Sequence, residues 1–152
     1  MSLCTVTLTV RVQKYGGSFA NCLAAAGGRA ESLLSLLLSD FGPCFADSNV
    51  YAGREVPILK RAQILVADVW ACFEGRGAGA FSDIDVITMF ADNRVPQSLL
   101  FVGALSYTDE LMGRLKRGEH LAQGSDEEIE IRCCSIWAVE VRFCVRVRST
   151  GD

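Results

Sequence analysis

The sequence has few of the features that mark several common protein classes. Its one histidine, His120, and seven cysteines without CxxC spacing give no basis for a zinc site, and we expect no metal or cofactor. Lys and Arg number 15 against 18 Asp and Glu, so a protein that binds nucleic acid through a basic face is not expected. No apolar run reaches the roughly 18 residues of a membrane-spanning helix. The alternating segment 2–12 lacks the apolar core of a signal peptide, which favours a cytoplasmic protein.

Motifs for nucleotide loops and common nucleophiles are missing as well. There is no P-loop, GxGxxG, GxSxG or HExxH, and GRGAG at 75–79 lacks the Lys-Ser/Thr pair of a phosphate loop. Most cysteines lie in apolar or helical stretches, where Cys behaves as a small hydrophobe. The adjacent pair Cys133–Cys134 would point to different sides of a helix. We therefore interpret the cysteines as thiols in a reducing compartment.

The residues that are present predict a helical, globular chain. Half of them are apolar, and the apolar positions recur at helical spacing. Capping residues, glycines and prolines predict helices over 18–26, 30–41, 57–74, 96–105, 108–118 and 126–141, with a capping box of Ser125 and Glu128 before the last. The segment 44–54 is typical of a loop. The predicted fold class is all-α, a multi-helix bundle, with minor strands allowed at 3–12 and 141–148.

Charged side chains interrupt one apolar stretch, from Lys60 to Gln97. Outside the Gly-rich segment 74–79 they are Lys60, Arg61, Asp68, Asp83, Asp85, Asp92 and Arg94. Charged groups are seldom fully buried unless they are paired or used, because removing water from them costs several kcal/mol. This stretch therefore either completes a structural network or builds a site.

The helix over 57–74 carries the first three of these charges and is expected to be central and buried. Arg61 and Asp68 are seven residues apart, so they share a face but lie too far apart to pair. Two polar faces on so apolar a helix indicate contacts with other elements more than a solvated surface. Both residues are either tie-points between helices or parts of a site.

Asp92 lies at a corner between two predicted helices. Its carboxylate either caps the following helix or is catalytic, with Lys60 or Arg94 keeping it ionised through opposite charge. Elsewhere, Asp83 and Asp85 are interpreted as caps or surface residues. Glu128 and Arg132, four residues apart on a helix, form a pair that requires no functional explanation.

Five segments in collinear order resemble the queuosine salvage protein family, described as queuosine 5′-phosphate N-glycosylase/hydrolase. They are YGGSF at 15–19, YAGREV at 51–56, KRAQILVADVW at 60–70, ITMFADNRVPQ at 87–97 and EIEIRCCSIWAVE at 128–140. The resemblance implies an architecture similar to helical DNA glycosylases. It also implies hydrolysis of the N-glycosidic bond of queuosine 5′-monophosphate, which releases queuine for salvage into tRNA.

The resemblance also assigns residues. Asp92 of MFADNR would be the catalytic carboxylate and Lys60 of KRAQ its partner, and Arg94, Arg61 and Asp68 are further candidates for substrate binding. Family members are much longer than this chain. Residues 14–141 would therefore form a partial family domain, with ends at 1–13 and 142–152 that do not resemble it.

Two alternatives to a queuosine 5′-phosphate hydrolase stay open. The chain could be a catalytically inactive helical fragment that binds nucleotide or another protein, with self-association through apolar faces that a longer chain would cover. A nucleic-acid glycosylase is the third hypothesis, and the acidic balance of the chain opposes it.

Overall fold

The computed structural model describes residues 13–148, with side chains described as far as Val141. Over this range the fold is mostly helical, with six α-helices and one small two-stranded hairpin in mid-chain. The all-α prediction is therefore confirmed in its main part but wrong about the strands. Residues 141–148 continue a long helix, and the hairpin begins in the segment 44–54 predicted as a loop and ends at Pro57. The other predicted strand, at 3–12, lies outside the described residues.

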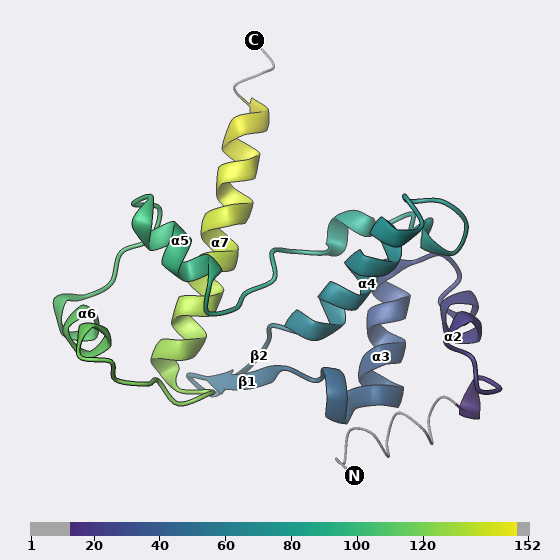
Figure 1. The fold of residues 1–152 in the computed structure, drawn as a ribbon, viewed down its shortest axis with the longest axis horizontal. Helices are drawn as coiled ribbons and strands as arrows, with labels where there is room; N and C mark the ends of the chain where they lie inside the picture. The colour runs from purple at the N-terminus through teal and green to yellow at the C-terminus, as the bar shows by residue number, and fades with distance from the viewer. Residues whose placement is uncertain (1–12, 149–152) are drawn as a thin grey trace. The chain divides into compact units, whose positions relative to one another are not determined.

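The chain divides into two compact units. Unit 1 holds the chain up to Asp47 together with Leu59–Thr88, and unit 2 holds Ser48–Ile58 and the chain from Met89 onward. The elements of unit 1 are α2 (Phe19–Ala25), α3 (Ala30–Phe45), α4 (Lys60–Cys72) and the 3-10 turns η1 (Gly77–Gly79) and η2 (Ile84–Val86). Those of unit 2 are β1 (Ser48–Tyr51), β2 (Arg54–Pro57), α5 (Val95–Phe101), α6 (Asp109–Lys116) and α7 (Asp126–Arg148) (Figure 1).

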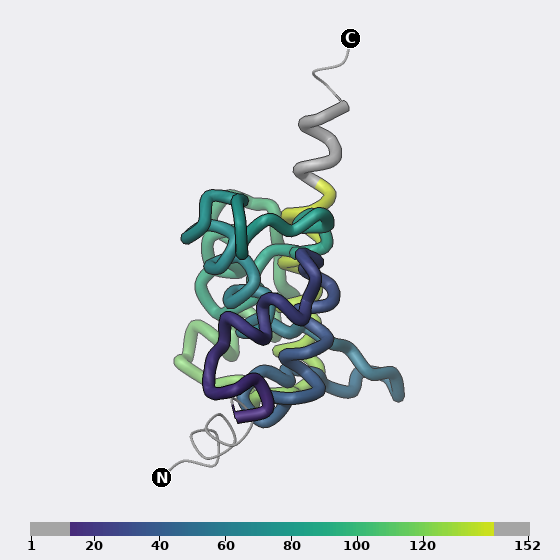
Figure 2. Tube along the Cα trace, turned by 90° about the vertical axis from the view of Figure 1, so that its right-hand side faces the viewer, coloured from purple at the N-terminus to yellow at the C-terminus, as the bar shows by residue number. Residues whose placement is uncertain are grey.

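The core of unit 1 is an apolar stripe of α3 packed against α4. Leu33, Leu37 and Phe41 recur at helical spacing on α3 and are at most 1% exposed. Ala62 and Val66 of α4 are fully buried in the same cluster. In Figure 2 the purple α2 segment lies close to the blue α3, and the contacts between these helices agree. Each large apolar side chain buried in this way contributes about 1.5–3 kcal/mol.

Helix α3 bends where the sequence predicted its end. Phe41 leaves helical geometry (φ −125°, ψ 22°), and the helix then continues through Pro43 to Phe45. Proline has no N–H, and its ring clashes with the preceding turn, so it breaks or bends a helix from within. The stop signal at Gly42-Pro43 is thus a kink. Just beyond it, Cys44 is disulfide-bonded, so the prediction of free thiols is wrong at this position.

The start of α4 is three residues later than predicted because the chain first makes a hairpin. β1 and β2 pair antiparallel through the turn Ala52-Gly53, whose two φ angles are both positive (48° and 76°), as a tight hairpin turn requires. Pro57, predicted as the first helical residue, is paired with Ser48 at the end of β2. The helix begins only at Lys60.

Asp83 confirms its predicted role as a cap, but for a helix far away in sequence. Its Oδ1 accepts a hydrogen bond from the Ala30 N–H at 2.6 Å, and its Oδ2 lies 3.2 Å from Nη2 of Arg29. Desolvation of the carboxyl opposes ionisation. The hydrogen bonds from the backbone N–H groups of Ala30 and Glu31 and the charge of Arg29 outweigh it, so the pKa of Asp83 is lowered.

The lowered pKa predicts a pH dependence of stability. The Asp83 carboxylate stabilises the fold fully above its unfolded-state pKa, near 4, and this stabilisation is lost as the pH falls through the lower folded-state pKa. Urea midpoints of Asp83→Asn should therefore lie below those of the unchanged protein at pH 7, and the gap should close in acid. Asp85→Asn, at an exposed neighbouring carboxylate, is the control and should show no such gap. A constant gap from pH 7 to pH 2.5 would contradict the assignment.

Two helix starts in unit 2 follow the predicted capping chemistry. The Thr108 side chain accepts from the Leu111 N–H at 3.3 Å and begins α6, and Ser125 Oγ accepts from the Glu128 N–H at 3.3 Å at the start of α7. Glu128 also accepts a hydrogen bond from the Gly124 N–H at 3.2 Å, so the return contact of the predicted capping box reaches the residue before Ser125. The long last helix thus begins where the sequence predicted.

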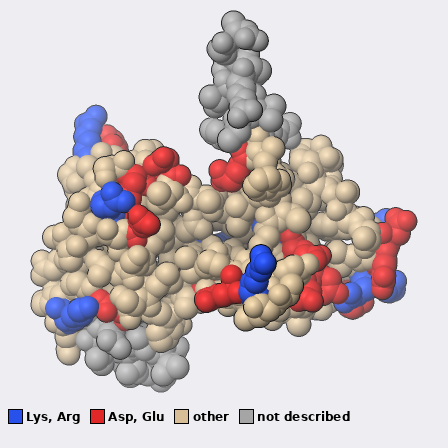
Figure 3. Space-filling model, turned by 180° about the vertical axis from the view of Figure 1, so that it is seen from behind, with Lys and Arg blue, Asp and Glu red and all other residues tan. Residues whose placement is uncertain are grey.

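The described surface shows mixed charge. On the face drawn in Figure 3, the Lys and Arg side chains of the described residues lie among Asp and Glu and do not merge into a basic stripe. Within the described residues, no helix combines the length and apolar character needed to cross a bilayer.

Candidate functional site

Three of the five predicted site residues lie on α4 in unit 1. Lys60 is its first residue, half-buried, and its backbone N–H donates to Oδ2 of Asp47 at 3.3 Å. The residue before it, Leu59, has φ +55°, a left-handed conformation that is strained for a branched side chain. The start of α4, and with it the base of the Lys60 side chain, is therefore fixed by a cap and by an unusual backbone.

Arg61 and Asp68 are exposed on the same helix. The interpretation that they contact other elements in preference to solvent is therefore wrong, and α4 is buried on one face only. The buried polar side chain of α4 is Gln63, 8% exposed, whose Oε1 accepts from the Thr88 N–H at 2.8 Å and from the Thr88 hydroxyl at 3.2 Å. A surface position leaves Arg61 and Asp68 accessible to a ligand, and their proposed roles in binding stay predictions.

The other two predicted residues lie in unit 2, in the turn that leads into α5. Oδ1 of Asp92 accepts hydrogen bonds from the N–H groups of Arg94 (2.8 Å) and Val95 (3.0 Å). These contacts cap the first turn of α5, so the capping alternative for Asp92 is confirmed as a contact. Arg94 is exposed, and Pro96 is buried in the first turn of the helix. A carboxylate held by two backbone donors has a fixed orientation.

Helix α7 holds the backbone just before Asp92. Arg132 donates from Nε to the Ala91 carbonyl at 3.1 Å and from Nη1 to Oε1 of Glu128 at 3.3 Å. Glu140 accepts from the Met89 N–H at 3.2 Å through its Oε1. The predicted pair of Arg132 with Glu128 is confirmed, and Arg132 is also buried, only 8% exposed.

The described geometry thus places Asp92 and Arg94 together in one turn of unit 2, and Lys60, Arg61 and Asp68 along one helix of unit 1. The pairing of Asp92 with Lys60 stays a prediction. No group of three or more His, Cys, Asp and Glu that could hold a metal ion occurs within the described range.

A buried carboxylate in unit 1 was not singled out from the sequence. Asp40, on α3, is 7% exposed, and its Oδ2 accepts from the Lys14 ammonium at 2.6 Å and from the Tyr15 hydroxyl at 2.5 Å. The hydrogen bond to Asp40, together with burial, raises the pKa of Tyr15 well above its ordinary value. Tyr15 belongs to the quoted YGGSF segment, and its ring stacks on Phe41. This network ties the start of the described chain to α3.

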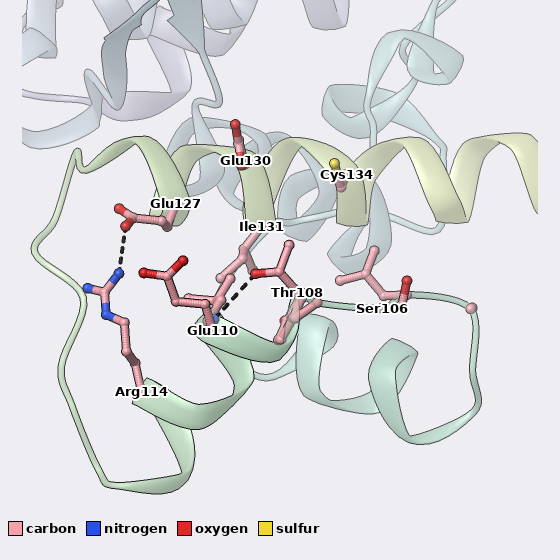
Figure 4. A pocket seen from close by; sticks show the side chains of 12 residues that line it. Ser106, Thr108, Glu110, Arg114, Glu127, Glu130, Ile131 and Cys134 are labelled. Carbon is pink, nitrogen blue, oxygen red and sulfur yellow. Dashed lines mark hydrogen bonds and ion pairs between the residues drawn. The ribbon is translucent and has the colours of Figure 1, made fainter.

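Unit 2 contains a cavity of about 480 Å³ between α6, α7 and the segment before α6. Figure 4 shows Arg114 directed at Glu127, with Glu110 beside them. Glu130 of α7 is also among the lining residues. The guanidinium of Arg114 is bound by Glu127 and Glu119, each at 2.8 Å. None of the five predicted site residues lines this cavity.

Comparison with known proteins gives a consistent result. A family model described as queuosine salvage protein matches residues 4–149. The chain is 48% identical over 132 residues to a queuosine 5′-phosphate N-glycosylase/hydrolase of Mus musculus, covering 87% of this chain and 39% of that protein. It is 53% identical over 131 residues to the protein of the same name from Schizosaccharomyces pombe, covering 86% of this chain and 38% of that protein.

A bacterial relative with this name, from Sphaerobacter thermophilus, is 43% identical over 134 residues, 41% of its length. The chain thus spans about two-fifths of the length of the curated relatives it matches. The resemblance read from five sequence segments is confirmed. The domain boundaries at 14 and 141 stay a prediction.

Proposed function

We propose, from the premise that this chain belongs to the queuosine salvage protein family, that it hydrolyses the N-glycosidic bond of queuosine 5′-phosphate and releases queuine. The observation that supports this most is the match of a single family model to residues 4–149. The relatives, of which the chain spans about two-fifths, carry that activity in their names. Activity of this chain by itself is part of the proposal.

The chemistry needs a carboxylate more than any other group. Breaking the bond between C1′ of the ribose and N9 of the base sends the bonding electrons to the base and leaves positive charge on the sugar. A carboxylate near C1′ stabilises that charge and accepts a proton from the water that attacks C1′. A 7-deazapurine has no N7 to protonate, so less help is available at the leaving group and more depends on the carboxylate.

Asp92 is the carboxylate we propose for this role. It lies in the ITMFADNRVPQ segment that resembles the family, and its orientation is fixed by the Arg94 and Val95 N–H groups. Fixed charge stabilises a transition state without the cost of reorganising around it. The capping contact and the catalytic role are therefore compatible.

The remaining predicted residues are proposed as substrate-binding groups. Arg94 and Arg61 carry exposed guanidinium groups, which bind phosphate in a bidentate manner, and Asp68 could accept hydrogen bonds from hydroxyl groups of the substrate. Lys60 would either keep the catalytic carboxylate ionised or bind the 5′-phosphate.

The Lys60 proposal predicts a measurable loss. Lys60→Met keeps the aliphatic stem and removes the charge, and the bond from the Lys60 backbone to Asp47 does not depend on the side chain. We expect kcat/KM for queuine release to fall about 10- to 100-fold, the range for one charge-assisted hydrogen bond. Lys116→Met, at an exposed position on α6, is the matched control. Unchanged kcat and KM in Lys60→Met would make Lys60 a structural residue.

The proposed function is tested by hydrolysis in H₂¹⁸O. The purified 152-residue protein is incubated with queuosine 5′-phosphate, and queuine and the sugar product are analysed by mass spectrometry. Hydrolysis predicts free queuine and ribose 5-phosphate with one ¹⁸O, since the water oxygen bonds to C1′. Substrate that stays intact with a folded chain would refute independent activity.

A second candidate function rests on the exposed aromatic side chains of unit 2. Phe101 is 92% exposed and Trp137 is 72% exposed, which is unusual for side chains of this size. Such surfaces are typical of contacts with another polypeptide or another copy. A concentration-dependent mass in light scattering, without queuine release, would favour an interaction module over an enzyme.

A further inference from the structure

The backbone from Met89 to Val95 is held at four points. Before Asp92, the Met89 N–H donates to Glu140 and the Ala91 carbonyl accepts from Arg132. After Asp92, the N–H groups of Arg94 and Val95 donate to its own Oδ1. Ala91, directly before the carboxylate, is fully buried. The first two points depend on side chains of α7, eight residues apart on that helix.

We propose that Arg132 and Glu140 are positioning residues that set the location of the Asp92 carboxylate. The inference rests on the proposed function, in which Asp92 acts on the substrate. Neither residue touches the substrate in the proposed mechanism. Each acts through the backbone, Glu140 at Met89 and Arg132 at Ala91.

Arg132 is expected to hold the backbone more firmly than Glu140, because its guanidinium is buried and hydrogen-bonded both to the Ala91 carbonyl and to Glu128. Its guanidinium joins the Ala91 carbonyl to Glu128, and Glu128 is itself fixed by the Gly124 N–H in the capping arrangement of α7. A continuous path of hydrogen bonds therefore runs from the start of α7 to the residue before Asp92. Burying a charged group is costly, and a hydrophobic residue would often pack equally well at such a position. A guanidinium here is explained if it holds a particular backbone geometry.

The proposal predicts a specific loss in catalysis. Displacement of a catalytic group by about 1 Å can cost about 100-fold in rate, because the reacting atoms are no longer aligned. We expect Arg132→Gln to lower kcat by at least about 10-fold and to change KM by less, since Arg94 is the one proposed binding group in the affected turn. Arg132→Lys keeps the charge but loses the forked geometry, so it should recover part of kcat.

Variants of Glu140 test the same idea with a more conservative pair of substitutions than those of Arg132. Glu140→Gln keeps a side-chain oxygen that can accept from the Met89 N–H, so kcat should stay near that of the unchanged protein. Glu140→Ala removes the acceptor and should lower kcat in the same manner as Arg132→Gln. The matched control for Arg132→Gln is Arg117→Gln, which removes a 69% exposed guanidinium from the end of α6.

A second measurement does not depend on turnover. Amide hydrogen exchange reports the local opening of the turn at the Arg94 and Val95 N–H groups, which the Asp92 side chain protects. Exchange at both should rise at least about 10-fold in Arg132→Gln and in Glu140→Ala, and stay unchanged in Glu140→Gln and Arg117→Gln.

The two measurements separate this inference from the proposed function. If the unchanged protein releases no queuine, the proposed activity of the chain fails, and exchange at Arg94 and Val95 still decides whether α7 holds the turn. If Arg132→Gln unfolds, the Glu140→Ala and Glu140→Gln pair gives the same test. Unchanged exchange and unchanged kcat in Arg132→Gln and Glu140→Ala would overturn the proposal. A loss of kcat in Glu140→Gln equal to that in Glu140→Ala would also overturn it for Glu140.

Discussion

Replacement of Asp92 by alanine should lower kcat for queuine release by about 100- to 1,000-fold, with a much smaller change in KM. The proposed role of the carboxylate is to stabilise charge that develops only in the transition state, and the loss of one such preorganised group typically has this cost. The measurement is steady-state release of queuine from queuosine 5′-phosphate by the purified chain, followed by chromatography.

Asparagine at this position separates the two roles of Asp92. Asn is as good a helix cap as Asp, so Asp92→Asn should keep the bonds from the Arg94 and Val95 N–H groups and leave α5 intact. It carries no negative charge and should lose kcat almost as completely as alanine. Asp85→Asn, at an exposed carboxylate of η2, is the matched control and should retain activity. An Asp92→Asn protein with unchanged kcat would show that Asp92 is only a cap.

Helix positions were predictable because their signals are local. Thr108 and Ser125 cap the helices that the sequence assigned to them, and each contact lies within three residues of the cap. A local hydrogen bond can be read from the order of the residues. The same holds for the aspartate of MFADNR, whose capping contacts reach only two and three residues ahead.

The hairpin was missed because its turn carries an unusual residue. Ala52 has φ +48°, where Asn, Asp or Gly is usual, so nothing in the segment 48–57 marked a tight turn between two strands. At the other end, the β-branched residues of 141–148 suggested a strand, but they continue α7. The continuing helix outweighed a weak local preference for strand there.

The parts of the site that escaped prediction are contacts between residues far apart in the chain. Arg132 reaches the carbonyl of Ala91 across 41 residues, and Glu140 reaches the Met89 N–H across 51. In the sequence, Arg132 has an acidic residue four positions before it, which predicts the pair with Glu128 and nothing beyond it. Arg132 is buried, and can reach the Ala91 carbonyl, only because α7 packs on the segment before α5.

Phe41→Ala should have the largest effect on stability, lowering the free energy of unfolding of unit 1 by about 3–5 kcal/mol. The Phe41 ring is 1% exposed and stacks on Tyr15 with ring centres 6.3 Å apart, so its removal leaves a cavity beside the Asp40 network. Because a whole domain is stable by only about 5–15 kcal/mol, this change should unfold a large fraction of the molecules in mild urea.

Each unit contains one tryptophan, so the fluorescence of each tryptophan reports the unfolding of its own unit. Trp70 lies on α4 in unit 1 and Trp137 on α7 in unit 2, so fluorescence of Trp70 in a Trp137→Phe background reports the unit that contains Phe41. Phe73→Ala, at a ring of unit 1 that is 48% exposed, makes the same chemical change at the surface and should shift the urea midpoint by much less. If Phe41→Ala and Phe73→Ala gave equal shifts, the kinked end of α3 would not be the core of unit 1. A large shift for Phe41→Ala alone would place the main stabilising contacts where α3 bends, next to the Lys14–Tyr15–Asp40 network.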